Sequence, residues 1–129
     1  MAGIKAKDTK AELAVRTFLF RQGFRYRIHD THLPGKPDVV LPKYKTVIFI
    51  NGCFWHAHQG CRHFAIPKTN RPFWERKLMK NRERDQKVLA LLLQMGYRVL
   101  VVWECELSPS SRREETLQGL ANEIWQVES

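Results

Sequence analysis

The chain lacks any run of about 18 apolar residues, the length that a transmembrane helix needs. Its first residues, Met1 to Lys5, have no apolar core of the kind found in secretion signals. Internal repeats and low-complexity linkers are also absent. We therefore expect one compact domain over residues 1–129, in the cytoplasm and without a membrane partner.

Acidic residues are few: 13 Asp and Glu stand against 22 Lys and Arg, which gives a formal charge of +9. A domain this basic commonly binds a polyanion, and nucleic acid is the leading class. A solvated basic surface or an anionic membrane partner are the alternatives from charge alone. The composition thus favours a nucleic-acid-binding protein, which we expect to be a monomer.

Cysteine is scarce as well, with three residues in all. An odd number in a chain without an export signal favours metal ligation over disulfides. Two of the cysteines, Cys53 and Cys61, enclose His56 and His58, and His63 follows closely, whereas Cys105 lies far away in sequence. Three cysteines and one histidine form a closed tetrahedral zinc site of the structural type.

This spacing predicts a zinc ion that ties a long loop to the end of the strand before Cys105. It leaves open which of His56, His58 and His63 is the ligand. The alternative is that the cysteines are small buried hydrophobes.

Hydrophobic periodicity predicts helices separated by strands, hence an α/β fold with a mixed β-sheet flanked by helices on both faces. Strands 38–41 and 46–50 form a hairpin, and a long helix from Pro72 to about Met95 joins the second strand to a parallel strand over 97–103. The remaining predicted elements are a helix from Thr9 to Gly23, a short strand 24–28, a loop over 51–70, and a last helix over 113–126 with Leu117, Leu120, Ile124 and Trp125 buried.

One carboxylate, Asp38, follows Pro37 at the start of a predicted strand. Hard cations such as Mg²⁺ take carboxylate and carbonyl oxygens, and phosphodiester cleavage uses such ions. A Pro-Asp pair is by itself more typical of a turn. The next strand ends at Asn51 without a second acid, so Asp38 alone does not establish a catalytic site.

Five segments in one order and at compatible spacing resemble a known family. They are KDTKAEL (Lys7–Leu13), LPGKPD (Leu33–Asp38), NGCFWH (Asn51–His56), Phe73–Trp74 with Lys80–Asn81, and VWEC (Val102–Cys105). Over about residues 1–107 the chain resembles the very short patch repair endonucleases of bacteria.

The resemblance implies a restriction-endonuclease-like fold with a zinc-stapled loop. It implies Mg²⁺-dependent hydrolysis that nicks one strand of double-stranded DNA 5′ to the T of a T·G mismatch. It also leaves a MutL-type mismatch-repair protein open as a second partner. The zinc ligands implied by the family are Cys53, His58, Cys61 and Cys105.

The same resemblance assigns catalytic roles. Asp38 and the backbone carbonyl of Ile50 would bind Mg²⁺. His56 would be the general base, Asp85 would orient it, and Glu12 would reach the metal-bound water. DNA contacts would come from Phe54, Trp55 and Trp74, which wedge into the duplex, and from Asn81 and Lys36.

Several of these residues have structural alternatives. Glu12 also fits a capping box with Thr9, Asp85 fits an i,i+4 ion pair on a charged helix, and the aromatic residues fit a core. Asn51 departs from the family, in which many members have a histidine that assists at the scissile phosphate. Because asparagine donates hydrogen bonds but cannot shuttle protons near neutral pH, we expect weaker or differently organised catalysis.

Two other functions fit the same residues. One is a zinc-stapled DNA-binding module with impaired catalysis, because Asn51 replaces a useful group. The other is a restriction-associated nuclease with a different target. Cleavage of a T·G duplex would distinguish a mismatch endonuclease from the DNA-binding module. A comparison of T·G with matched and other mismatched duplexes would distinguish it from the restriction-associated nuclease.

Zinc removal is the first testable prediction. Structural zinc contributes folding free energy, so a strong chelator should unfold the protein or lower its melting temperature. Thermal melts with and without chelator, together with metal analysis, provide the measurement. A protein that contains no zinc and melts identically in both conditions would refute the zinc site.

Overall fold

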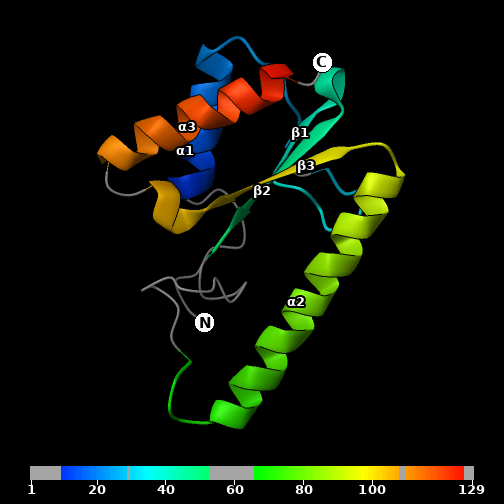
Figure 1. The fold of residues 1–129 in the computed structure, drawn as a ribbon, viewed down its shortest axis with the longest axis vertical. Coiled ribbons are helices and arrows are strands. Elements are labelled where there is room, and N and C mark those ends of the chain that lie inside the picture. Colours follow the sequence, from blue (N-terminus) through cyan, green and yellow to red (C-terminus); the bar gives the residue numbers. More distant parts are fainter. Residues whose placement is uncertain (1–9, 29, 53–65, 108–109, 127–129) are drawn as a thin grey trace.

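The computed structural model describes residues 10–28, 30–52, 66–107 and 110–126. These residues form a small α/β structure in which helices cover a three-stranded sheet (Figure 1). The elements in chain order are α1 (Lys10–Arg21), β1 (Val39–Leu41), the 3₁₀ helix η1 (Pro42–Tyr44), β2 (Thr46–Asn51), α2 (Arg71–Gln94), β3 (Arg98–Trp103), the 3₁₀ helix η2 (Glu104–Leu107) and α3 (Ser110–Trp125).

The sheet is mixed, as predicted, with β2 between the other two strands. β1 and β2 form an antiparallel hairpin in which Val39 pairs with Ile48. Pro42 starts the connection, and Lys45, in the left-handed conformation, ends it. β3 lies parallel to β2, with Thr46 opposite Arg98, because α2 carries the chain back along the sheet.

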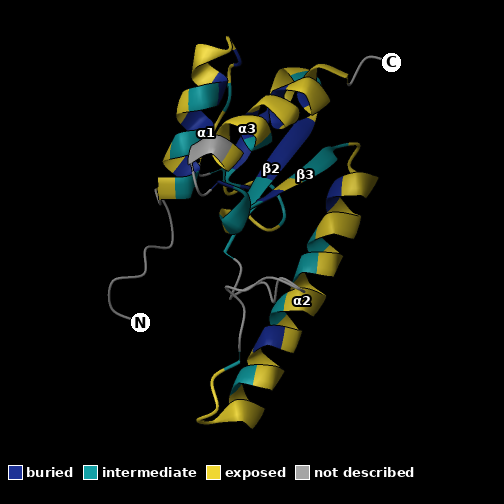
Figure 2. Cartoon of the chain, turned by 60° about the vertical axis from the view of Figure 1, so that its left-hand side comes forward, coloured by how far each residue is buried: buried dark blue, intermediate teal, exposed yellow. Residues whose placement is uncertain are grey.

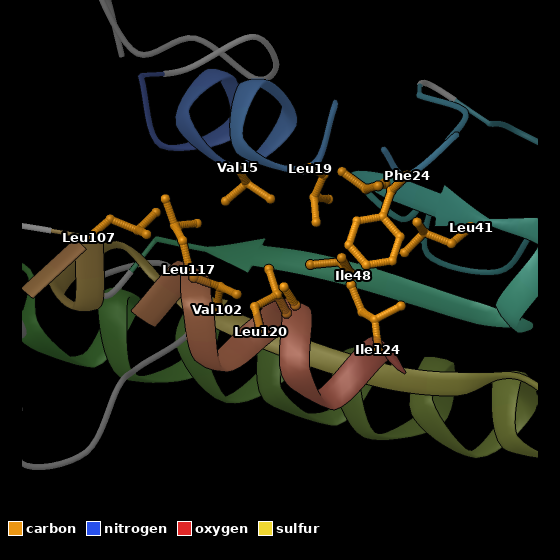
Figure 3. Packing of buried hydrophobic residues seen from close by; sticks show 12 residues of the cluster. Val15, Leu19, Phe24, Leu41, Ile48, Val102, Leu107, Leu117, Leu120 and Ile124 are labelled. Atoms are coloured by element: carbon orange, nitrogen blue, oxygen red, sulfur yellow. The ribbon is translucent and has the colours of Figure 1, made fainter. Parts of the chain in front are cut away.

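The central strand β2 separates two apolar clusters because alternate side chains of a strand point to opposite faces. Ile48 belongs to the larger cluster, which packs the sheet against α1 and α3 (Figure 3). Val47 belongs to the smaller one, in which Leu92 and Val88 of α2 cover the other face. The prediction that helices cover both faces of the sheet is therefore confirmed.

The helix ends follow local chemistry. α1 stops two residues before Gly23, which has a φ of +92°, a conformation that glycine adopts without strain. In α2, Pro72 occupies the first turn, where its missing N–H removes no helical hydrogen bond. Figure 2 shows α2 as a largely exposed helix with one narrow stripe of buried and half-buried residues.

Two local predictions are wrong. The strand expected over 24–28 is reduced to a single bridge between Arg27 and Val40, because the short β1 offers it little backbone to pair with. Trp125, expected in the buried stripe of the last helix, is 45% exposed. It stacks on Phe24 at a ring distance of 5.3 Å and so covers the margin of the core.

Across the described ranges, no helix combines the length and the apolar character that crossing a membrane requires.

Leu92 and Leu93 provide a matched test of how α2 is held. Leu92 is completely buried against the sheet, whereas its neighbour Leu93 is 55% exposed. Leu92→Ala should cost about 2–5 kcal/mol of unfolding free energy, because it leaves a cavity. Leu93→Ala should change it by less than about 0.5 kcal/mol. Urea unfolding of both variants gives the measurement, and equal losses would contradict the packing of α2 through Leu92.

Candidate active site

Asp38 lies where the hairpin brings the start of β1 beside the last residues of β2. Since Val39 pairs with Ile48, the residue before Val39 stands near Ile50. The backbone N–H of Ile50 donates a hydrogen bond of 2.6 Å to Oδ2 of Asp38. The preceding Pro37 is fully buried, so the carboxylate is fixed from both sides while remaining partly accessible to solvent.

The carbonyl of Ile50 faces the same side as this hydrogen bond. In a β-strand, the N–H and the C=O of one residue point toward the same neighbouring strand. Because the Ile50 N–H points to Asp38, the Ile50 carbonyl oxygen also lies on the β1 side of β2. A carboxylate and a carbonyl are hard oxygen donors, and Mg²⁺ is commonly held by one or two carboxylates with water filling its other positions. These two groups fit that ion.

The end of β3 lies beside the end of β2. Asn51 pairs with Trp103 in the parallel register, and η2 begins with the next residue. The Trp103 N–H donates to Oε1 of Glu106 at 2.9 Å, so the chain turns sharply at this point. Cys105, in η2 and partly buried, is thereby brought to the same end of the sheet as Asp38 and Asn51.

Glu12 is in the first turn of α1, which reaches the end of the sheet where β2 and β3 finish (Figure 1). It is buried and forms a 2.8 Å ion pair with Arg16, one turn further along. The backbone carbonyl of Arg16 in turn accepts a hydrogen bond of 3.2 Å from the Tyr26 hydroxyl. Removing one partner of such a buried ion pair costs about 3–5 kcal/mol, so Arg16 fixes the position of the Glu12 carboxylate.

The inward stripe of α2 contains three of the predicted site residues. All residues of α2 that are not exposed fall on it, at spacings of three and four, as expected for one helix face. They are Trp74, Leu78, Asn81, Asp85, Val88 and Leu92. The last two pack on the sheet, so Asp85 lies one turn before the sheet contact and on the same face.

Positions 81 and 89, four residues from Asp85, are asparagine and leucine, whereas Arg82 lies three residues before it, so the alternative of a helix ion pair stays open at that spacing. Asn81 accepts a 2.9 Å hydrogen bond from the Arg84 guanidinium. Trp74 is half-buried and meets Phe73 edge to face at 5.2 Å. Phe73 itself is 49% exposed, so this aromatic pair is only partly covered.

Lys36 is exposed in the turn before Asp38. Its φ of +48° is unusual for a residue with a side chain, and its N–H donates to the Leu33 carbonyl at 3.3 Å. The turn therefore presents this cation to solvent two residues away from the carboxylate.

Several predicted residues lie outside the described part of the chain, namely Cys53, Phe54, Trp55, His56, His58 and Cys61. Their roles stay predictions. Within the described residues, no group of three or more His, Cys, Asp or Glu side chains is arranged to hold a metal ion. This bears little on zinc, because only Cys105 of its four predicted ligands is described.

Sequence reasoning missed Arg16 as the partner of Glu12. The i,i+4 spacing of the two residues was a usable signal, because a glutamate four residues before an arginine favours an ion pair on a helix. The burial of this pair was not predictable from the sequence of α1 alone, because it depends on the elements that pack against α1.

Comparison with known proteins agrees with the motifs. The family model described as DNA mismatch endonuclease Vsr matches residues 1–62. A type II nicking enzyme, V.NmeAIP of Neisseria meningitidis serogroup A, is 52% identical over 124 residues, covering 96% of this chain and 88% of the relative. The DNA mismatch endonuclease Vsr of Escherichia coli is 45% identical over 107 residues, covering 83% and 68%. The type II nicking enzyme V.XorIIP of Xanthomonas oryzae is 44% identical over 120 residues, covering 93% and 88%.

These relatives place the chain in the class of endodeoxyribonucleases. It belongs to the Vsr family of DNA mismatch endonucleases.

The outer side of α2 supplies the charge for a salt test. Its seven Lys and Arg residues are all exposed, and its N-terminal half extends past the end of the sheet at which β2 finishes (Figures 1 and 2). If this surface binds DNA phosphates, affinity should fall with salt by a log–log slope of about −0.9 per phosphate contacted. Lys80→Gln should reduce that slope by about one unit.

Lys43→Gln is the matched control, because Lys43 is exposed in η1 at the opposite end of the sheet. Titration of duplex DNA by fluorescence anisotropy at several salt concentrations gives the slopes. A flat salt response, or an equal effect of both substitutions, would exclude α2 as the phosphate-binding face.

Proposed function

We propose that the protein nicks one strand of duplex DNA 5′ to the T of a T·G mismatch, by Mg²⁺-dependent hydrolysis, in very short patch repair. The observation that carries the proposal is the Asp38 carboxylate held at 2.6 Å against the backbone of Ile50, in a chain of the Vsr family. The proposal extends to a restriction-endonuclease-like fold, with which the mixed sheet and its flanking helices agree.

Asp38 and the Ile50 carbonyl would hold Mg²⁺. When bound, this ion stabilises the charge that develops on the attacking and leaving oxygens of the phosphodiester. The hydrogen bond from the Ile50 N–H fixes Oδ2 of Asp38, and with it the carboxylate, at this end of the sheet. Glu12, held in place by its ion pair with Arg16, would accept a hydrogen bond from water at this end of the sheet.

Proton transfer would depend on His56, as general base, and on Asp85, which would orient it. The half-buried position of Asp85 on the inward stripe of α2 supports this role, because a carboxylate on that face points toward the sheet rather than into bulk solvent. Asn51 would donate a hydrogen bond near the scissile phosphate.

Zinc would be held by Cys53, His58, Cys61 and Cys105. What supports this is the place of Cys105 in η2, at the end of β3 beside Asn51. A closed thiolate and imidazole set would fix the segment between β2 and α2 to the sheet without opening a coordination position for water.

Mismatch binding would use Phe54, Trp55 and Trp74 as wedges, with Asn81 and Lys36 in contact with the strand. Unstacking by aromatic side chains requires the least energy at a mismatch, where pairing is already weakened. The partial exposure of the Phe73–Trp74 pair on α2 fits this use. We expect the protein to act as a monomer in the cytoplasm, and a MutL-type protein is a candidate partner.

A second candidate function is nicking at a target other than the repair mismatch, in association with a restriction system. The names of two relatives favour it, since V.NmeAIP and V.XorIIP are type II nicking enzymes. A DNA-binding module with impaired catalysis is the third possibility, and Asn51 is the residue that motivates it.

Asp38→Asn is the decisive variant for the catalytic proposal. An asparagine oxygen can still accept the Ile50 N–H, so the hairpin should persist while the charge that attracts the cation is lost. We expect the nicking rate on a labelled T·G duplex with Mg²⁺ to fall by about 10²-fold or more. Glu123→Gln, which changes an exposed acid near the end of α3, should leave the rate unchanged.

The position of the cut and the choice of duplex separate the candidates. A nick 5′ to the mismatched T, absent on the matched duplex, supports mismatch repair. Cleavage of other mismatches or matched sites at an equal rate would support the restriction-associated function. Equal inertness of wild type and Asp38→Asn would reject an enzyme and favour the DNA-binding module.

A further inference from the structure

The turn before Asp38 packs against α2 more closely than a side chain would allow. A Cβ atom placed on Gly35 would lie 2.5 Å from Cγ1 and 3.1 Å from Cγ2 of Val88. Gly35 also has a φ of +74°, a conformation in which other residues are strained. The close approach and the backbone conformation therefore both require glycine at this position.

Neither side of this contact can move away easily. Leu33, at the start of the turn, and Val88 both pack on the smaller apolar cluster around Val40, Val47 and Leu92. At the other end of the turn, Pro37 is fully buried. Gly35 itself is exposed and Val88 is half-buried. The resistance to movement therefore comes from the cluster beneath the contact, which is close-packed and transmits displacement rather than absorbing it.

The contact lies between two groups of the proposed catalytic machinery. Asp38 is three residues after Gly35, and the hydrogen bond to Ile50 fixes it to β2. Asp85 is three residues before Val88, on the same inward stripe of α2. Leu92 and Val88 hold α2 against the sheet, and Val88 is also where α2 meets the turn before Asp38. How closely the turn and the helix approach at this point therefore affects the distance between the two carboxylates.

We propose that Gly35 and Val88 are positioning residues: their contact sets the separation between the metal-binding carboxylate Asp38 on the sheet and Asp85 on α2. This inference rests on the proposed function, in which the two carboxylates act on one scissile phosphate. It assigns a catalytic consequence to a glycine and a valine, whose side chains can neither bind a metal ion nor transfer a proton.

Gly35→Ala tests the proposal in the full-length protein. The added methyl group must push the turn and α2 apart by about 1 Å, and a misplacement of that size costs roughly 10- to 100-fold in rate. Single-turnover nicking of a T·G duplex at saturating enzyme and Mg²⁺ should slow by this factor. The dissociation constant for the same duplex, measured without Mg²⁺, should stay at the wild-type value.

Gly23→Ala is the matched control. Gly23 has a φ of +92°, but a Cβ there would meet no atom within 4 Å. This variant suffers the same kind of backbone strain without the steric overlap. It should lower the melting temperature and leave the nicking rate unchanged, which separates loss of stability from loss of positioning.

Val88→Ala should rescue Gly35→Ala. It removes both γ-methyl groups and leaves Cβ of Val88 3.3 Å from the new methyl, which is tight but tolerable. We expect Val88→Ala alone to slow nicking modestly, and the double variant to be faster than Gly35→Ala. Such non-additivity is expected for residues in direct contact.

The outcomes distinguish failure of the positioning role from failure of the proposed function. If wild type nicks and Gly35→Ala nicks equally fast, or if the double variant is no faster than Gly35→Ala, the positioning role is overturned. Should Gly35→Ala fail to fold, a full wild-type rate for Val88→Ala alone would overturn it as well. An inert wild type would refute the proposed function and, with it, this inference.

Discussion

The antiparallel register of β1 against β2 is the constraint on which the site depends. Pairing Val39 with Ile48 brings Asp38 within 2.6 Å of the Ile50 backbone. A slip of one residue would turn every side chain of β1 to the opposite face and separate the carboxylate from the Ile50 carbonyl. The register is held by burial, because Val39 and Leu41 must face one apolar cluster while Val40 faces the other.

The long helix α2 links this hairpin to the rest of the molecule. Its C-terminal half covers one face of the sheet through Val88 and Leu92, and its inward stripe continues through Asp85 toward Trp74. The outer face of its first half is basic and exposed. One helix thus provides the parallel crossover, a carboxylate on the side of the site, and the charge expected to meet a polyanion.

Much of the fold was predictable from local pattern. The hairpin, the parallel strand after α2, and the glycine at the end of α1 all follow from hydrophobic period and turn residues, and the structure confirms them. The strand expected over 24–28 is wrong, because this segment forms only an isolated bridge between Arg27 and Val40. Trp125 was misplaced because helical spacing does not indicate whether a residue lies in the core or at its margin.

The sequence by itself determined which residues can do chemistry: one carboxylate after a turn, a cluster of cysteine and histidine, and a basic helix, in motifs that agree with the family. Only the tertiary structure decided that Asp38 meets Ile50, that Glu12 is buried with Arg16, and that Gly35 touches Val88. Periodicity depends on neighbours along one element, whereas these contacts depend on how separate elements pack. Close packing of separate elements fixes such distances to fractions of an ångström, and the pattern of residues along one element does not predict them.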